Sequence, residues 1–183
     1  MLSGLLRRAG AGPALLLACA APAPEQGPAQ THDQIIFVPS PPAVVTAMLE
    51  LAGVDETDIV YDLGSGDGRI PIAAALEFGA RGVGIEIDPQ LVRGSEVAAQ
   101  AAGVADRVTF LAQDLFEADI SAATVVTLYL LPSLNARLLP KLNAELAPGT
   151  PVVSHAFDIG DIPPERTVQV GDRTIYRWTT PIQ

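Results

Sequence analysis

Residues 61–70 read YDLGSGDGRI, with glycine at positions 64, 66 and 68 directly after a short apolar run. Glycine at this density predicts a loop whose backbone adopts positive φ angles or comes close to another group. The residues before the loop, 59–63, predict a buried strand, and the residues after it, 69–78, predict a helix. This order of strand, loop and helix decides the fold, and the group that the loop approaches decides the function.

Strands and helices alternate on both sides of this loop. Helical spacing of apolar residues after a proline predicts a helix over 41–52 that ends at Gly53. Further strands are expected at 82–87, 107–111, 123–130 and 151–155, and further helices at 89–102 and 133–147. Two β-rich runs, 166–170 and 174–179, predict a hairpin around Gly171 and Asp172. The sequence therefore predicts an α/β fold, a Rossmann-like, doubly wound, mostly parallel seven-stranded sheet with a C-terminal antiparallel hairpin.

Nucleotide phosphates fit the glycine-rich loop poorly. In a doubly wound sheet, ligands bind beyond the carboxyl ends of the strands, where the strand order reverses, and this loop lies there if its strand is central. A P-loop needs lysine followed by serine or threonine, whereas this loop continues with Asp67, Gly68 and Arg69. The dinucleotide fingerprint needs a glycine where Arg69 stands, and Asp67 would repel a pyrophosphate. NAD and FAD therefore remain minor alternatives.

The acids around the loop favour a ligand without phosphates. S-adenosylmethionine is such a ligand, because its ammonium and sulfonium groups are cationic and its ribose and adenine form hydrogen bonds. Glu86 ends the second strand, where a carboxylate can accept from ribose hydroxyls. Ile87 is placed to pack against adenine, and Asp114, after the third strand, to reach its exocyclic amine. In the alternative interpretation, Asp62 and Glu86 only cap helices and the glycines form an ordinary turn.

These residues carry a resemblance to the class I, seven-stranded methyltransferases. The stretch DLGSGDG at 62–68 resembles their first motif, and GIE at 84–86 and QDL at 113–115 resemble later ones. The resemblance runs from about Asp33 to Trp178. More narrowly, FVPSP at 37–41, with DLGSGDGRI and GVGIEID, is similar to a small lysine methyltransferase family. Its mitochondrial members modify the ATP synthase c-subunit and the adenine nucleotide translocase, and it has prokaryotic relatives.

The resemblance implies a methyltransferase that uses S-adenosylmethionine and methylates lysine in proteins. It places the methionine part of the cofactor at Asp62, Gly64 and Gly66, the ribose at Glu86 and the adenine at Asp114. It also implies that the segment around Ser40, where threonine is usual, packs across the cofactor. The expected cofactor-binding residues are Pro39, Ser40, Asp62, Gly64, Ser65, Gly66, Asp67, Gly68, Glu86, Ile87, Gln113, Asp114 and Leu115.

Candidate catalytic residues follow the fourth strand, where class I enzymes place them. The stretch YLLPSLN at 129–135 supplies Tyr129, Pro132 and Asn135. It is not Asn-Pro-Pro-Tyr, which disfavours methylation of adenine N6 or of glutamine amides. No strong general base is required, because an apolar channel lowers the pKa of a lysine amine. Of the residues near this edge, His155 is expected to be a hydrogen-bonded structural histidine, and Arg69 to pair with an acid or a helix face.

The composition of the chain limits the kinds of molecule that it is expected to bind. The chain has 11 Lys and Arg against 21 Asp and Glu, a formal charge of −10, which argues against tight non-specific binding of nucleic acid. A basic or membrane protein is the expected methyl acceptor. One cysteine and two histidines give no intrachain disulfide and little support for a metal site. The alternatives are a small-molecule methyltransferase, or a lipid-anchored protein that keeps the fold without turnover.

Residues 1–30 have the layout of a secretory signal followed by a proline-rich linker, ahead of a methyltransferase domain at 31–183. The stretch before and including Cys19 resembles a bacterial lipobox, which predicts a lipid anchor at this cysteine and a location in the cell envelope or periplasm. A mitochondrial presequence is one alternative. A misassigned start codon, which would leave the protein cytoplasmic, is another.

Overall fold

The computed structural model describes residues 38–183. The predicted leader and Cys19 lie outside the described residues, as does Phe37. The helices are α1 (Pro42–Ala52), α2 (Arg69–Phe78), α3 (Pro89–Ala102) and α4 (Pro132–Glu145). The strands are β1 (Ile59–Leu63), β2 (Arg81–Glu86), β3 (Val108–Ala112), β4 (Val125–Leu128), β5 (Pro151–His155), β6 (Arg166–Val170) and β7 (Arg173–Thr179).

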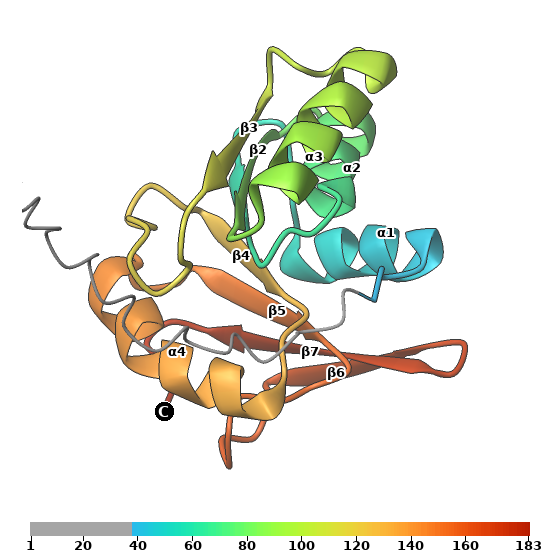
Figure 1. Cartoon of the computed structure of the whole chain (residues 1–183). Helices are drawn as coiled ribbons and strands as arrows, with labels where there is room; N and C mark the ends of the chain where they lie inside the picture. Colours follow the sequence, from blue (N-terminus) through green and yellow to red (C-terminus); the bar gives the residue numbers. More distant parts are fainter. Residues whose placement is uncertain (1–37) are drawn as a thin grey trace, which may run out of the picture. The chain divides into compact units, whose positions relative to one another are not determined.

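The strands form one sheet in the order β3-β2-β1-β4-β5-β7-β6 (Figure 1). Strands β1 to β5 are parallel, and β7 pairs antiparallel with both β5 and β6. The predicted seven-stranded α/β fold and its C-terminal hairpin are confirmed. The strand order reverses between β1 and β4, so the loops that follow these two strands meet at the edge where such folds bind ligands.

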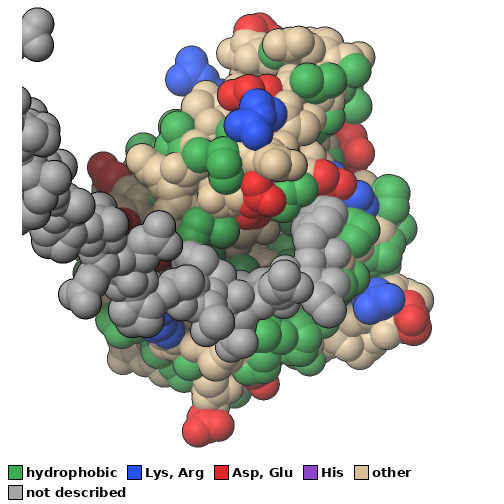
Figure 2. Space-filling view, viewed as in Figure 1, with side chains coloured by type: hydrophobic (Ala, Val, Ile, Leu, Met, Phe, Trp, Pro, Cys, Tyr) green, Lys and Arg blue, Asp and Glu red, His purple; other side chains and the backbone are tan. Residues whose placement is uncertain are grey.

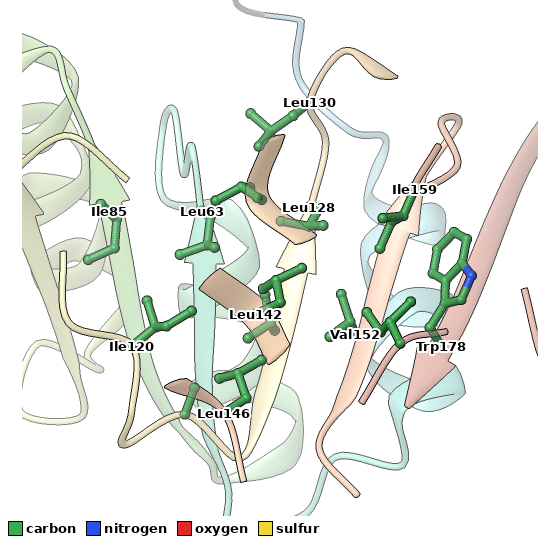
Figure 3. Packing of buried hydrophobic residues seen from close by; sticks show 14 of the residues in the cluster. Leu63, Ile85, Ile120, Leu128, Leu130, Leu142, Leu146, Val152, Ile159 and Trp178 are labelled. Carbon is green, nitrogen blue, oxygen red and sulfur yellow. The ribbon is translucent and has the colours of Figure 1, made fainter. Parts of the chain in front are cut away.

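Helices cover both faces of the sheet, α1, α2 and α3 on one and α4 on the other (Figure 1). Every residue of β4 is buried, as expected for a central strand covered on both sides. On the α4 face, Leu142 and Leu146 belong to one buried cluster with Leu128, Val152 and Trp178 (Figure 3). Because side chains alternate between faces along a strand, Val125 and Val153 point instead into the cluster under α1.

Most predicted bounds differ from the structure by no more than two residues. The fourth strand, predicted at 123–130 and observed at Val125–Leu128, differs by two residues at both ends. Leu130 leaves the ladder because it turns back over the glycine-rich loop, where its Cδ2 atom lies 2.8 Å from the position of a Cβ on Gly64. No helix within residues 38–183 has the length and apolar character needed to cross a membrane.

Candidate active site

The glycine-rich loop between β1 and α2 depends on left-handed backbone. Gly64, Gly66 and Gly68 have φ angles of 85°, 54° and 75°. The backbone amides of Gly64 and Ser65 both donate to the carbonyl oxygen of Ile85 on β2, each at 2.9 Å. These bonds fold the loop over the end of the sheet, and the positive φ angles of the loop are the reason why glycine is needed here.

Gly84 on β2 provides the space for this loop. A Cβ at Gly84 would lie 2.5 Å from the ring of Phe110 and 2.6 Å from the Oγ atom of Ser65. The Ser65 hydroxyl is buried, and within residues 38–183 it has no hydrogen-bond partner. Gly84 therefore lets the ring of Phe110 and the glycine-rich loop pack together on one strand.

Carboxylates gather beside the loop. Glu86, at the end of β2, accepts a hydrogen bond from the backbone amide of Gly66 (2.9 Å) and one from that of Asp88 (3.0 Å). Asp62 is buried on β1 and accepts from the hydroxyl of Thr127 at 2.8 Å. Burial, against the lowering effect of the Thr127 bond and with smaller contributions from the charges of Glu86 and Asp67, raises the pKa of Asp62 to about 7. The site thus concentrates negative charge that a cation would stabilise.

Arg69 joins the loop to the segment before α1. Its Nε atom donates to Asp67 at 2.8 Å, and its Nη1 atom donates to the backbone carbonyl of Ser40 at 2.7 Å. Although partial burial alone would raise the pKa of Asp67, the hydrogen bonds and charge of Arg69 outweigh it and hold the pKa low. The expected pairing of Arg69 with an acid is confirmed.

The remaining loops complete this edge of the sheet. Asp114 follows β3 and accepts from the backbone amide of Phe116 at 2.9 Å, and Leu115 comes near the position of a Cβ on Gly64. Gln113 is exposed, and Ile87 after β2 is 58% exposed, unusual for so large an apolar side chain. In Figure 2, which shares the view of Figure 1, the surface near this edge is hollowed, with acidic side chains at the rim.

The chain matches the family model of the ANTKMT methyltransferase domain over residues 62–166, more than half of its length. It is 47% identical over 137 residues to a protein-lysine N-methyltransferase of Saccharolobus islandicus, covering 74% of this chain and 85% of the relative. It is 32% identical over 176 residues to a lysine N-methyltransferase of the ATP synthase c-subunit from Xenopus laevis, covering 96% and 76%. This chain belongs to the ANTKMT methyltransferase family.

Solved structures agree with this assignment. A crystal structure of an RNA methyltransferase from Salinibacter ruber with S-adenosyl-L-homocysteine is 64% identical, with a TM-score of 0.78, over 80% of this chain and 95% of that one. A SAM-dependent methyltransferase from Thiobacillus denitrificans, 23% identical with a TM-score of 0.59 over 67% and 51%, shares the fold. The protein is a class I, S-adenosylmethionine-dependent methyltransferase, as its motifs predicted.

The site of this methyltransferase fits its cofactor. The buried carboxylate of Asp62 and the half-buried one of Glu86 suit a cationic ligand, and the buried Ser65 hydroxyl offers an unused hydrogen-bonding group. The left-handed glycines turn the loop at the carboxyl end of β1, where such folds bind ligands. Within residues 38–183 no group of three His, Cys, Asp or Glu side chains is arranged to hold a metal ion.

The three candidate catalytic residues occupy different environments. The ring of Tyr129, after β4, lies 4.0 Å from that of His155 and 6.2 Å from that of Phe157, between centroids. Pro132 is exposed at the first turn of α4. Asn135 is fully buried, and its Nδ2 atom donates to the carbonyl of Asp158 at 3.0 Å. Of the three, Tyr129 lies among the aromatic side chains at this edge of the sheet, whereas Asn135 faces the methyltransferase core.

Sequence reasoning missed two residues that contact the predicted site residues of this methyltransferase. Thr127, the hydrogen-bond partner of Asp62, is the one hydroxyl in the apolar strand VVTL, and that contrast is a signal that could have found it. Phe157 stacks on Tyr129 from a loop, and nothing in the local sequence marks it. His155 is buried and hydrogen-bonded as expected, with its Nδ1 atom 2.8 Å from the hydroxyl of Ser40.

Proposed function

We propose that this methyltransferase transfers the methyl group of S-adenosylmethionine to the side-chain amine of lysine in a protein. The observation that carries the proposal is the 47% identity, over 85% of its length, to a relative named a protein-lysine N-methyltransferase. The relatives named as lysine N-methyltransferases of the ATP synthase c-subunit support the same acceptor.

The cofactor residues expected from the sequence form part of this proposal. Asp62, Gly64, Ser65, Gly66, Asp67 and Gly68 hold the methionine part, and Glu86 accepts from the ribose. Ile87, Gln113, Asp114 and Leu115 surround the adenine, and Pro39 and Ser40 cover the cofactor. Apart from Pro39 and Ser40, these residues converge at the ends of β1, β2 and β3, which supports the assignment.

The acceptor end of the site suits an amine that has to lose its charge. S-adenosylmethionine supplies a methyl group already activated by the positive charge on its sulfur. Lysine has a free pKa of about 10.4, so it reacts after its ammonium is deprotonated, which an apolar aromatic environment favours. Tyr129, His155 and Phe157 provide such an environment. Burial lowers the pKa of His155 to about 4, with a smaller contribution from Arg173, so the imidazole is neutral.

Charge and apolar exposure indicate the kind of protein that carries the lysine. The chain has a formal charge of −10, which attracts a basic acceptor. Val38 lies two residues before Ser40 and is 50% exposed. Leu131 lies two residues after Tyr129 and is equally exposed. We infer an acceptor segment that is basic and partly apolar, as found in basic proteins and at the ends of membrane helices.

RNA is the second candidate acceptor, because the 64% identical crystal structure is described as an RNA methyltransferase. The acidic composition favours protein over RNA, since binding a polyanion needs cationic side chains that displace counterions. The lysine proposal and the RNA alternative therefore need an experiment that separates them.

The experiment incubates the purified full-length chain with methyl-labelled S-adenosylmethionine and a heat-inactivated extract of the expression host, with Asp62→Asn as the inactive control. Label that protease releases, RNase leaves, and amino-acid analysis identifies as methyllysine supports the proposal. Label released by RNase supports the RNA alternative and overturns the lysine proposal. Label confined to compounds that pass an ultrafilter indicates a small-molecule acceptor and also overturns it.

A further inference from the structure

Ser40 is held at two of its atoms. Its carbonyl oxygen accepts from Arg69 Nη1 at 2.7 Å, and its hydroxyl lies 2.8 Å from Nδ1 of His155, which is 115 residues away in the sequence. Its side chain is buried, with 3% of the residue exposed. Ser40 therefore contacts both Arg69, which follows the glycine-rich loop, and His155, which ends β5 and packs on Tyr129.

The two flanking prolines make these bonds decisive for the segment. Pro39 and Pro41 have no backbone N–H, and their rings fix φ, so residues 39–41 are stiff but poor in donors. In the described part of the chain, the bonds from Arg69 and His155 are the ones that tie residues 38–40 to the sheet and its loops. The carbonyl of Pro41 accepts from the amides of Val44 and Val45 in α1, so fixing Ser40 as well fixes the whole Pro39-Ser40-Pro41 segment.

Arg69 connects Ser40 to the glycine-rich loop. Arg69 opens α2, and its guanidinium is fixed by hydrogen bonds that Nε and Nη2 donate to the carboxylate of Asp67. Asp67 lies between Gly66 and Gly68, and the amide of Gly66 is itself bonded to Glu86. A displacement of the loop is therefore transmitted to the carbonyl of Ser40 through one rigid, planar group.

His155 connects Ser40 to the aromatic side chains of Tyr129 and Phe157. His155 is fully buried, its ring packs on Tyr129, and among residues 38–183 its Nε2 atom has no hydrogen-bond partner. The next residue, Ala156, has a φ of 65°, and the amide of Phe157 donates back to the carbonyl of His155 at 2.8 Å. A left-handed alanine is strained, and the surrounding contacts must hold it in place. The turn directs Phe157 onto Tyr129 and leaves His155 facing Ser40.

We propose that Arg69 and His155 are positioning residues that act jointly through Ser40, holding the Pro39-Ser40-Pro41 segment in register with the glycine-rich loop and with Tyr129. Neither is a catalytic residue, because His155 is buried with its Nδ1 atom occupied and Arg69 is occupied by Asp67 and Ser40. The segment is held when both bonds are present and released when either is lost. This inference concerns cofactor binding and stands whether the methyl acceptor is lysine or another nucleophile.

The test is a double-mutant cycle in the full-length chain, with binding of S-adenosylhomocysteine measured by calorimetry. In the native background, His155→Leu is expected to weaken binding about fivefold, the effect of one net hydrogen bond. In the Arg69→Met background the segment is already released, so the same change has no further effect. His155→Asn, which keeps a hydrogen-bonding atom near the position of Nδ1, is expected to restore most of the binding.

Val153→Ala is the matched control, because Val153 is buried two residues earlier on the same strand and contacts the cluster under α1. It lowers the free energy of unfolding without weakening binding. Ser40→Ala tests the same bond from its other end with a smaller change, in case His155→Leu fails to fold. Equal weakening by His155→Leu in both backgrounds overturns joint action. Unchanged binding in the native background, with lowered stability, reduces His155 to a packing role, and loss of binding in the control does the same.

Discussion

Asp62 and Thr127 are register partners on the neighbouring strands β1 and β4, and the Thr127 hydroxyl donates to the Asp62 carboxylate at 2.8 Å. The pair lies where the strand order of the sheet reverses. Both residues are buried, so the carboxylate has exchanged water for a single hydroxyl among its described neighbours. A buried acid kept in this way destabilises the free protein and stabilises a complex with a cationic ligand.

Asp62→Asn is expected to stabilise the cofactor-free protein at neutral pH. The pKa of Asp62 rises from 3.8 when unfolded to about 7 when folded, so the native state loses stability as pH rises through that window. The gain in free energy of unfolding should reach about 2 to 4 kcal/mol at about pH 8 and shrink towards about pH 4. Urea unfolding at both pH values measures it.

The same variant should bind S-adenosylhomocysteine at least about tenfold more weakly, because the ligand loses a buried anion. Thr127→Val is the opposing control, since it removes the hydroxyl that stabilises the charged form and should destabilise the protein most at high pH. A protein destabilised at about pH 8 by Asp62→Asn would show that the carboxylate is a structural requirement.

Glu86→Ala is expected to weaken cofactor binding about 10- to 100-fold, the range for hydrogen bonds to a charged group. Glu86 accepts from the amide of Gly66, so its loss also loosens the loop. Glu77→Ala is the matched control, because Glu77 is exposed on α2 and its carboxylate accepts from Thr46. Calorimetry with S-adenosylmethionine compares the two, and similar affinities would remove Glu86 from the cofactor site.

Gly84→Ala and Gly94→Ala should change stability in opposite directions. A Cβ at Gly84 meets the Phe110 ring at 2.5 Å, so the alanine overpacks the site and lowers the free energy of unfolding by about 1 to 3 kcal/mol. Gly94, inside α3, has nothing within 4 Å of its Cβ position, so alanine there raises it by about 0.5 to 1 kcal/mol. Urea unfolding measures both, and a neutral Gly84→Ala would mean that Phe110 moves freely.

The sequence predicted the bounds of helices well where a glycine marks the end of the helix. The predicted bounds of α2 and α3 agree with the structure, because each helix ends at a left-handed glycine, Gly79 and Gly103. It could not predict where β4 ends, since Leu130 is as apolar as the strand before it and leaves the sheet because of its packing beside Gly64.

The contacts within the site were harder to predict than the loops that carry it. The motifs placed Asp62 and Glu86 at one sheet edge, but the Thr127 partner of Asp62 depends on strand register, which apolar runs do not specify. The contact between Ser40 and His155 spans 115 residues, and neither neighbourhood indicates it. Long-range hydrogen bonds follow from tertiary packing, so local sequence patterns predict where a site lies more reliably than which of its residues bond to one another.

Tyr129→Ala should separate methyl transfer from cofactor binding. The Tyr129 ring packs on His155 and Phe157 at the proposed acceptor end, away from Glu86, so binding of S-adenosylhomocysteine should change less than about threefold. Methyl transfer should fall at least about 100-fold, because the acceptor loses its orientation. Tyr129→Phe keeps the ring and tests the hydroxyl alone. Full methyl transfer by Tyr129→Ala would place the acceptor elsewhere.

His155 should give the protein an acid sensitivity opposite in sign to that of Asp62. Burial lowers the pKa of His155 from 6.5 to about 4, so its stability contribution is complete above about pH 6.5 and is lost as pH falls towards about 4. Relative to His155→Asn, the native chain should therefore lose up to about 3 kcal/mol over that interval. Because Asp62 acts in the other direction across an overlapping range, the two chains are compared at each pH, and the shared Asp62 effect cancels.

Unfolding by urea gives the stabilities, and nuclear magnetic resonance of the imidazole gives the titration directly. An imidazole signal in the native state that titrates near pH 6.5 would show that the ring is solvated, and it would remove the reason for a stable neutral histidine against Ser40 and Tyr129.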